Sequence, residues 1–125
     1  MDENTIGIIY LTAEVDQEFG IVQSSIEISS EELKSFLNQT NKYLMFKIIN
    51  GILYILGDNR SVLFPSEGYI NPEEVFAVYS KSKVYELIDT GGEKINAVEN
   101  RNGIFSVTNG LYTLEASHWC PPLCS

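Results

Sequence analysis

Residues 43–56 constrain the fold more than any other stretch of the chain. Two apolar segments there flank the dipeptide Asn50-Gly51. Asn-Gly is the preferred pair for a two-residue type I′ turn, because both turn positions require a positive φ. The sequence therefore predicts a β-hairpin, which would pair Ile49 with Ile52, Ile48 with Leu53 and Phe46 with Ile55.

Both strands of this hairpin are apolar at nearly every position, instead of alternating between apolar and polar residues. Strands of this kind must be covered on both faces of their sheet. Helices can cover one face. The other face then needs a second sheet, a curled barrel wall or a partner molecule.

The segments outside the hairpin indicate further short strands and two helices. Ser29 and Glu32 have the spacing of a capping box, which predicts a helix near residues 30–39. Ser82 is the expected cap of a second helix near residues 82–89. Runs of β-branched and apolar residues predict strands at 5–12, 20–28, 61–64, 75–79, 94–98, 104–108 and 111–116.

These elements predict an α+β fold, with a mostly antiparallel sheet and the two short helices on one side of it. The order strand, helix, strand, Asn-Gly turn, strand, strand occurs in residues 21–64 and again in residues 75–116. Two repeated βαβββ units are therefore a hypothesis, although β-rich domains often show such periodicity by chance. We expect one domain over residues 1–117 and a tail, HWCPPLCS, over residues 118–125. The predicted core comprises Ile8, Ile9, Leu33, Phe36, Leu37, Leu44, Phe46, Ile48, Leu53, Ile55, Phe76, Val84, Leu87, Ile88, Ile104 and Val107.

The negative charge is concentrated at one end of the sequence. The chain has 17 acidic and 8 basic side chains in 125 residues, a net charge of -9. Residues 1–32 contain eight of the carboxylates and no Lys or Arg. The acidic balance disfavours direct binding to nucleic-acid phosphate, which requires clustered basic side chains.

A segment with one sign of charge can present an acidic face to a basic groove and accelerate association with it. It can equally be a solvated surface that keeps a small protein in solution. Three of its acidic residues alternate along a predicted turn or strand and lack the spacing of a calcium loop. The candidate partner-binding residues are Glu14, Asp16, Glu18, Glu27, Glu31 and Glu32.

The C-terminal tail gathers the only His, the only Trp and both Cys of the chain. His118, Cys120 and Cys124 supply three metal ligands, one fewer than a closed structural zinc site needs. Two other interpretations are a labile disulfide between the two cysteines, and a Pro-stiffened extension that packs Trp119 onto the domain or a partner. Trp119 is the candidate contact residue of the tail, and neither a metal nor another cofactor is expected.

Catalytic patterns are sparse. Any Ser-His or Cys-His pair must use His118, which lies in a terminal segment that is poorly suited to rigid positioning. The SxxK spacing that begins at Ser80 is explained by helix capping. The sequence contains no Gly-rich phosphate loop, HExxH or CxxC motif. No catalytic residue is therefore expected.

The leading interpretation is a small acidic, non-catalytic module that binds and inhibits a basic partner protein, as immunity proteins and phage inhibitors of host defence do. The first alternative is a small-ligand binder or dimeric structural subunit that uses the two-sided apolar hairpin. The second is a ribosomal peptide precursor with a modified Cys-containing tail.

The compartment follows from what the sequence lacks. Its first residues have neither the positive charge nor the apolar run of a secretory signal. No stretch is long and apolar enough to span a bilayer. We therefore expect a cytoplasmic protein with no direct membrane or nucleic-acid partner.

Overall fold

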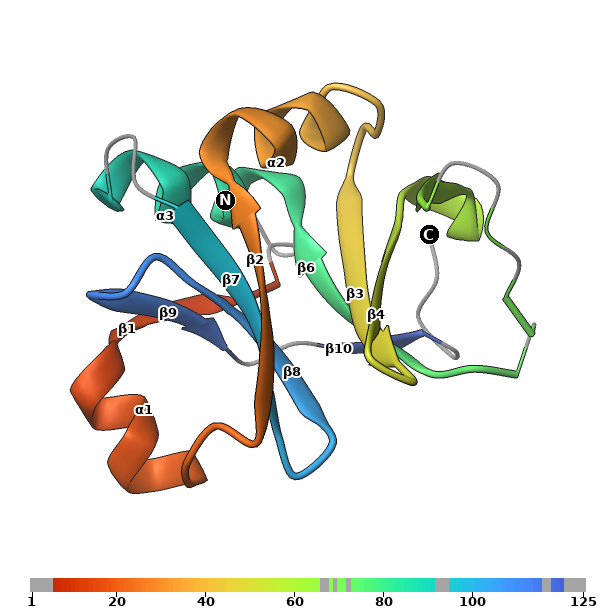
Figure 1. Cartoon of the computed structure of the whole chain (residues 1–125). Helices are drawn as coiled ribbons and strands as arrows, with labels where there is room; N and C mark the ends of the chain where they lie inside the picture. Colours follow the sequence, from red (N-terminus) through yellow and green to blue (C-terminus); the bar gives the residue numbers. More distant parts are fainter. Residues whose placement is uncertain are drawn as a thin grey trace.

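The structure, a computed structural model, is α+β and consists of two antiparallel sheets and three α-helices within the residues it describes (Figure 1). These residues are 6–65, 68, 70–71, 73–91, 95–115 and 118–120, without the side chains of Phe19 and of residues 118–120. The first sheet contains β1 (Ile8–Leu11), β9 (Tyr112–Glu115), β8 (Ile104–Thr108), β7 (Ile95–Arg101) and β2 (Ser24–Ser29), in that order. The second sheet contains β10 (His118–Cys120), β6 (Phe76–Ser80), β3 (Tyr43–Ile49), β4 (Ile52–Leu56) and β5 (Val62–Phe64).

The helices lie at two ends of the molecule. Helices α2 (Ser30–Leu37) and α3 (Lys81–Gly91) contact each other over one end of the space between the sheets (Figure 1). Helix α1 (Thr12–Phe19) lies at the opposite end, next to β1 and β9. A short 3-10 turn, η1 (Asp58–Arg60), connects β4 to β5.

The hairpin of β3 and β4 has the predicted register. Ile49 pairs with Ile52, Ile48 with Leu53 and Phe46 with Ile55. Asn50 and Gly51 have φ values of 53° and 79°, as a type I′ turn requires. The prediction of the turn and of both strands is confirmed.

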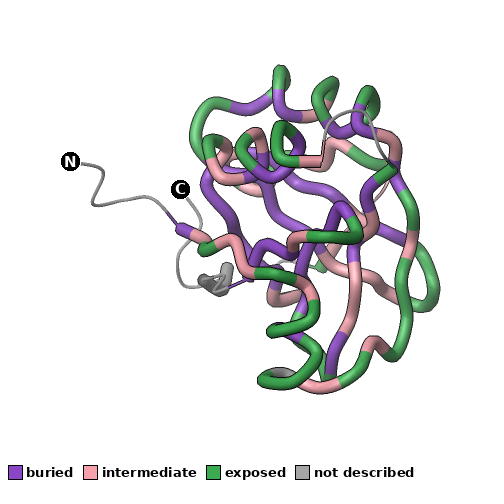
Figure 2. Tube along the Cα trace, turned by 90° about the vertical axis from the view of Figure 1, so that its left-hand side faces the viewer, coloured by how far each residue is buried: buried purple, intermediate pink, exposed green. Residues whose placement is uncertain are grey.

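Both faces of this hairpin are covered by the chain itself. The face toward the first sheet packs into the main core, which also contains side chains of α2, α3 and the first sheet. The opposite face carries Met45 and Leu56, which pack with Ile6, Phe76 and Val78 in a second cluster. Figure 2 shows that buried residues run through the interior strands, while exposed ones recur on the helices and turns. The second sheet is therefore covered by the first sheet and two helices on one face, and by connecting segments on the other.

Two predicted core residues are wrong. Ile8 and Ile104 are 50% and 36% exposed, because each lies on the face of the first sheet that points away from the main core. Their neighbours along the strands, Ile9 and Phe105, point into that core instead. A strand alternates its side chains between faces, so an error of one residue exchanges the buried and the exposed set.

The helix starts agree with the sequence in one case and differ in the other. The Ser29 hydroxyl accepts a hydrogen bond from the Glu32 amide at 3.1 Å, which confirms the predicted cap of α2. The second helix begins at Lys81, so Ser82 lies inside α3 and does not cap it. The residue that precedes α3 is Ser80, the last residue of β6.

Helix α1 was not predicted from the sequence. The sequence predicts a turn or strand at residues 14–18, with Glu14, Asp16 and Glu18 on one side of it. In the helix Glu14 and Glu18 are one turn apart, while Asp16 lies on a different face. Val15 is its one fully buried apolar side chain in the described part of the chain.

The two stretches with the same order of elements also have corresponding strand registers. β2 pairs with β7 so that Ile26 is opposite Val98, and β6 pairs with β3 so that Ala77 is opposite Phe46. Each stretch thus contributes its first strand to the sheet that contains the other stretch's remaining strands. The hairpins β3-β4 and β7-β8 have the same pairing pattern around their Asn-Gly turns. A common origin by duplication stays a hypothesis.

Candidate functional site

A small apolar pocket lies between the edges of the two sheets. Its volume is about 80 Å³. Four elements contribute to its wall: β2, α2, β4 and β5. We call it the β2 pocket, and it is lined by Ile26, Glu27, Ile28, Glu32, Phe36, Leu53 and Phe64.

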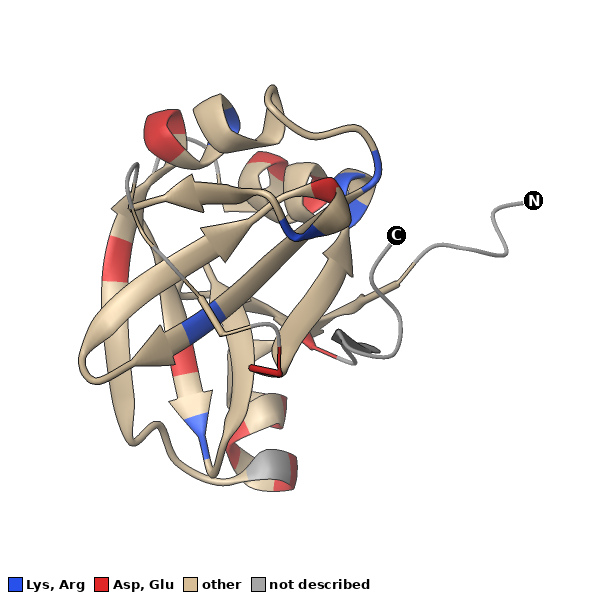
Figure 3. Ribbon diagram, turned by 90° about the vertical axis from the view of Figure 1, so that its right-hand side faces the viewer, with Lys and Arg blue, Asp and Glu red and all other residues tan. Residues whose placement is uncertain are grey.

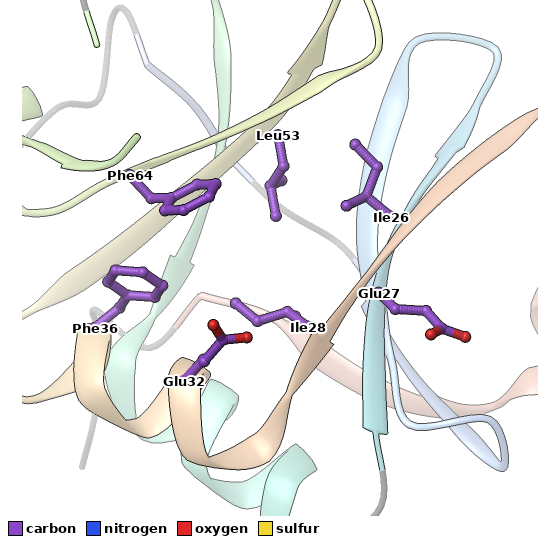
Figure 4. Close-up of a pocket in the computed structure, with 7 residues that line it drawn as sticks. All are labelled: Ile26, Glu27, Ile28, Glu32, Phe36, Leu53 and Phe64. Carbon is purple, nitrogen blue, oxygen red and sulfur yellow. The ribbon is translucent and has the colours of Figure 1, made fainter. Parts of the chain in front are cut away.

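Aromatic rings form one wall of the β2 pocket. The rings of Phe36 and Phe64 have their centroids 5.8 Å apart and are tilted by 60°. Phe64 is 41% exposed, although large aromatic side chains are usually buried. Figure 4 shows Ile26 and Ile28 on the opposite side of the pocket, with Leu53 between the two walls. The pocket therefore offers an apolar surface that the rest of the described chain does not cover.

Carboxylates lie beside this apolar surface. The Glu32 carboxylate points toward the pocket from the first turn of α2, whereas the Glu27 side chain points away from it (Figure 4). Glu31 lines a neighbouring depression of about 360 Å³ at the start of α2. Among the described residues, none of these three carboxylates forms an ion pair with Lys or Arg. Their negative charge is therefore available to a ligand.

The structure divides the predicted acidic binding residues into separate groups. Glu27, Glu31 and Glu32 are exposed near the β2 pocket, on β2 and α2. Glu14 and Glu18 are exposed on α1, at the other end of the molecule. Figure 3 shows acidic positions on the helices at both ends. The acidic segment of the sequence therefore does not form one continuous face, because β1, α1 and β2 carry it across the molecule.

Asp16 belongs to neither group, because it is bound to a buried arginine. Its Oδ1 lies 2.7 Å from Nη2 of Arg101, whose side chain is 1% exposed. Nη1 of Arg101 lies 3.1 Å from Oε1 of Glu99 and 3.8 Å from Oε2 of Glu115. Arg101 also donates hydrogen bonds to the Gly20 carbonyl at 2.9 Å and to the Ser106 hydroxyl at 3.2 Å. This Arg101 cluster ties α1 and the segment after it to three strands of the first sheet.

Burial raises the pKa of Glu99 above its ordinary value, and the positive charge of Arg101 only partly opposes that effect. A raised pKa in the folded state means that ionisation of Glu99 disfavours folding. The stabilising contribution is full below the unfolded-state pKa and is lost as the pH rises through the folded-state pKa.

Replacing Glu99 with Gln should therefore raise the free energy of unfolding at pH 7 by about 1 kcal/mol or less. Arg101 keeps Asp16 and Glu115 as partners in this variant. Urea unfolding from pH 4 to pH 7 should show a smaller decline of stability with pH than in the original protein. Identical slopes for the two proteins would show that Glu99 does not titrate abnormally.

None of the three pockets described here is lined by a residue of the Arg101 cluster. A depression of about 330 Å³ beside α1 is lined by Tyr10, Glu14, Val15, Gln17 and Glu18. Glu99 and Glu115 line neither it nor the β2 pocket. The carboxylates that contact Arg101 therefore do not line these pockets, and the prediction of a non-enzyme stays a prediction.

The start of the predicted tail is part of the second sheet. His118–Cys120 form β10, which pairs antiparallel with β6 and places Trp119 opposite Ala77. The Trp119 side chain and the whole of residues 121–125 lie outside the described structure, so the predicted Trp119 contact and the fate of the cysteines remain untested. In the described part of the chain, no group of His, Cys, Asp and Glu has the arrangement of a metal site.

Sequence reasoning identified Glu27, Glu31 and Glu32 but missed the β2 pocket and the Arg101 cluster. The pocket combines residues of four elements, whose meeting point no local pattern reveals. For the cluster one signal was present: Glu99 and Arg101 alternate with the apolar Val98 on a strand, which indicates a charged sheet face.

Comparisons of the chain with models of known protein families, with curated proteins and with solved structures find no match. Within the described residues, the helices are too short and too polar for any of them to traverse a bilayer.

Proposed function

We propose that this protein is a non-catalytic binding module that uses the β2 pocket and its surrounding carboxylates to bind, and thereby inhibit, a basic partner protein. The observation that carries the proposal is an apolar pocket beside carboxylates that have no basic partner in the described chain. An apolar centre with a polar rim is the usual composition of a protein-binding surface. The charged rim would accelerate association and select a positively charged partner.

Pocket size supports a protein partner over a small molecule. Pockets that hold drug-sized ligands measure roughly 300–1,000 Å³, whereas the β2 pocket measures about 80 Å³. That space suits a single side chain of a larger partner. The first alternative function, a ligand binder, is therefore the weaker proposal for this site.

Charge reversal at the pocket tests the proposed function. The variant Glu27→Lys/Glu32→Lys should lose the captured basic partner in a pull-down, because both exposed carboxylates flank the same site. Glu14→Lys/Glu18→Lys is the matched control, since it makes the same change of charge on α1. The control variant should retain the partner.

Ionic strength provides the second part of this test. Capture by the original protein should weaken as salt rises past about 0.1 M, where the screening length falls to about 10 Å. The captured partner should lose its own activity when the original protein is added, and keep it with the Glu27→Lys/Glu32→Lys variant. Equal capture by both charge-reversed variants would refute the β2 pocket as the binding site.

A further inference from the structure

The chain's own N-terminal segment fills the place in the fold that corresponds to the β2 pocket. Ser80 at the end of β6 corresponds to Ser29 at the end of β2, because each precedes a helix and the two strands pair in the same register. The Ser80 amide donates to the Ile6 carbonyl at 3.0 Å, and the Ile6 amide donates to the Ser80 hydroxyl at 2.5 Å. From there the segment continues into β1, which pairs with β9.

Gly7 lies at the position of this segment that corresponds to the β2 pocket. A Cβ atom added to Gly7 would lie 2.8 Å from Leu114, 3.2 Å from Tyr79 and 3.5 Å from Lys83. The residues that correspond to these three, by strand register and helix position, line the β2 pocket: Phe64, Ile28 and Glu32. One side of the molecule thus holds an extended segment where the other side has a pocket.

The outer edges of the corresponding strands β6 and β2 also differ, because only one of them is paired. The outer edge of β6 is paired with β10, in antiparallel direction. In the described part of the chain, no strand pairs with the outer edge of β2 or with that of β5. An unpaired strand edge exposes backbone N–H and C=O groups that can pair with another extended segment.

We propose that an extended segment of the basic partner adds to β2 as an antiparallel strand and inserts one aliphatic side chain into the β2 pocket. This inference rests on the proposed function and specifies its binding mode. Side chains of an added strand alternate between the two faces. Aliphatic residues would face the pocket, and the Lys or Arg residues between them would face the side of Glu27, whose side chain points away from the pocket (Figure 4).

Charge distinguishes this occupant from a second copy of the chain. The chain's own segment at Gly7 lies beside Lys83, and the residues before it in the sequence include Asp2 and Glu3. In the β2 pocket Glu32 takes the place of Lys83. A segment that binds there should therefore be basic, unlike the chain's own N-terminus.

The correspondence between β6 and β2 also indicates which backbone amides of β2 would pair with the added strand. The Ser80 amide points away from β3, since it donates to Ile6. Successive amides of a strand alternate between its two edges. We therefore expect the amides of Ser25, Glu27 and Ser29 to face the open edge of β2.

The test uses three synthetic peptides and the unmodified protein, so that no variant has to fold. The probe is acetyl-KIKLKVK-amide, which alternates aliphatic and basic residues. The first control, acetyl-KKILVKK-amide, has the same composition without the alternation. The second control is the probe with the backbone amide of its third residue, a lysine on the Glu27 side, N-methylated. This removes a donor that would face β2 and leaves the charge unchanged.

The probe should slow hydrogen exchange at the Ser25 and Glu27 amides about tenfold at saturation. Both controls should bind about tenfold more weakly, as expected for a lost hydrogen bond or a misplaced aliphatic side chain. Equal affinity of all three peptides, with unchanged exchange in β2, would overturn strand addition. That outcome would leave the proposed function intact, because charge-reversal capture tests it independently. Failure of all three peptides to bind would also overturn strand addition.

Discussion

Replacing Arg101 with Met should lower the free energy of unfolding by about 3–5 kcal/mol, because it leaves buried carboxylates without their cation. The side chains of Glu99 and Glu115 are 14% and 3% exposed, so water cannot readily replace the guanidinium group. Methionine fills much of the same volume, and the loss therefore measures charge and hydrogen bonding more than packing. Urea unfolding at pH 7 gives the value.

The matched control for this prediction is Arg101→Lys. Lysine keeps the positive charge but cannot contact Asp16, Glu99 and the Gly20 carbonyl at once, because it lacks the planar guanidinium fork. Its loss of stability should lie between those of the original protein and the Met variant. A loss below about 1 kcal/mol for the Met variant would contradict the assignment of Arg101 as a buried structural cation.

The Arg101→Met substitution should also have a local effect on α1. Asp16 and the Gly20 carbonyl both bind Arg101, so the helix loses two of its attachments to the first sheet. The substitution should then increase the hydrogen-exchange rates of α1 amides, relative to the original protein, by more than those of β3 amides. This difference should remain after correction for the loss of global stability. Uniformly faster exchange would show that the Arg101 cluster supports the whole fold and not α1 in particular.

The contacts of α1 with Arg101 also explain why this helix could not be predicted from the sequence. Leu11, at its N-cap, makes no side-chain capping bond, and the helix has only eight residues. Such a short helix gains little from its own sequence and depends on tertiary contacts. Its ion pair to Arg101 joins residues 85 positions apart, which no local pattern reveals.

The β3-β4 hairpin represents the opposite case. Its turn, its strands and their register all follow from adjacent residues, because Asn50-Gly51 fixes the turn and the turn fixes the pairing. The two-sided apolar pattern also implied that both faces would be covered. The covering elements could not be identified from sequence, since one of them is Ile6, far away in the chain.

The candidate site combines residues that local sequence could select with a pocket that depends on long-range packing. Glu27, Glu31 and Glu32 could be selected from the charge of residues 1–32, and Ser29 placed the last two in the first turn of a helix. The structure separates them from Glu14, Asp16 and Glu18, which lie on α1, a helix that the sequence did not predict. The β2 pocket itself depends on Leu53 and Phe64, whose approach to β2 follows only from the packing of the two sheets.

Replacing Phe46 with Ala should lower the free energy of unfolding by about 3–5 kcal/mol, the usual effect of removing a buried aromatic side chain. Phe46 has no exposed surface and lies on the middle strand of the second sheet, between Ile55 and Ala77. Its ring centroid is 6.2 Å from that of Tyr79, whose hydroxyl donates to the Phe105 carbonyl of the first sheet at 2.6 Å. The cavity left by Phe46 would therefore lie where the two sheets meet.

A control on the same hairpin separates packing from strand propensity. Ile52→Ala removes a side chain that is 49% exposed, at the end of the hairpin, and should cost less than about 1 kcal/mol. If Phe46→Ala cost no more than Ile52→Ala, the aromatic side chain would not be part of a tightly packed core.

The position that corresponds to Phe46 in the first sheet is Val98, which is also fully buried. Both side chains belong to the same cluster, so the two sheets should unfold in one cooperative transition. For each of the variants Phe46→Ala and Val98→Ala, circular dichroism and tyrosine fluorescence should then give the same midpoint of urea unfolding. Different midpoints for the two probes within one variant would mean that each sheet is stable on its own, and that the space between the sheets is an interface and not a core.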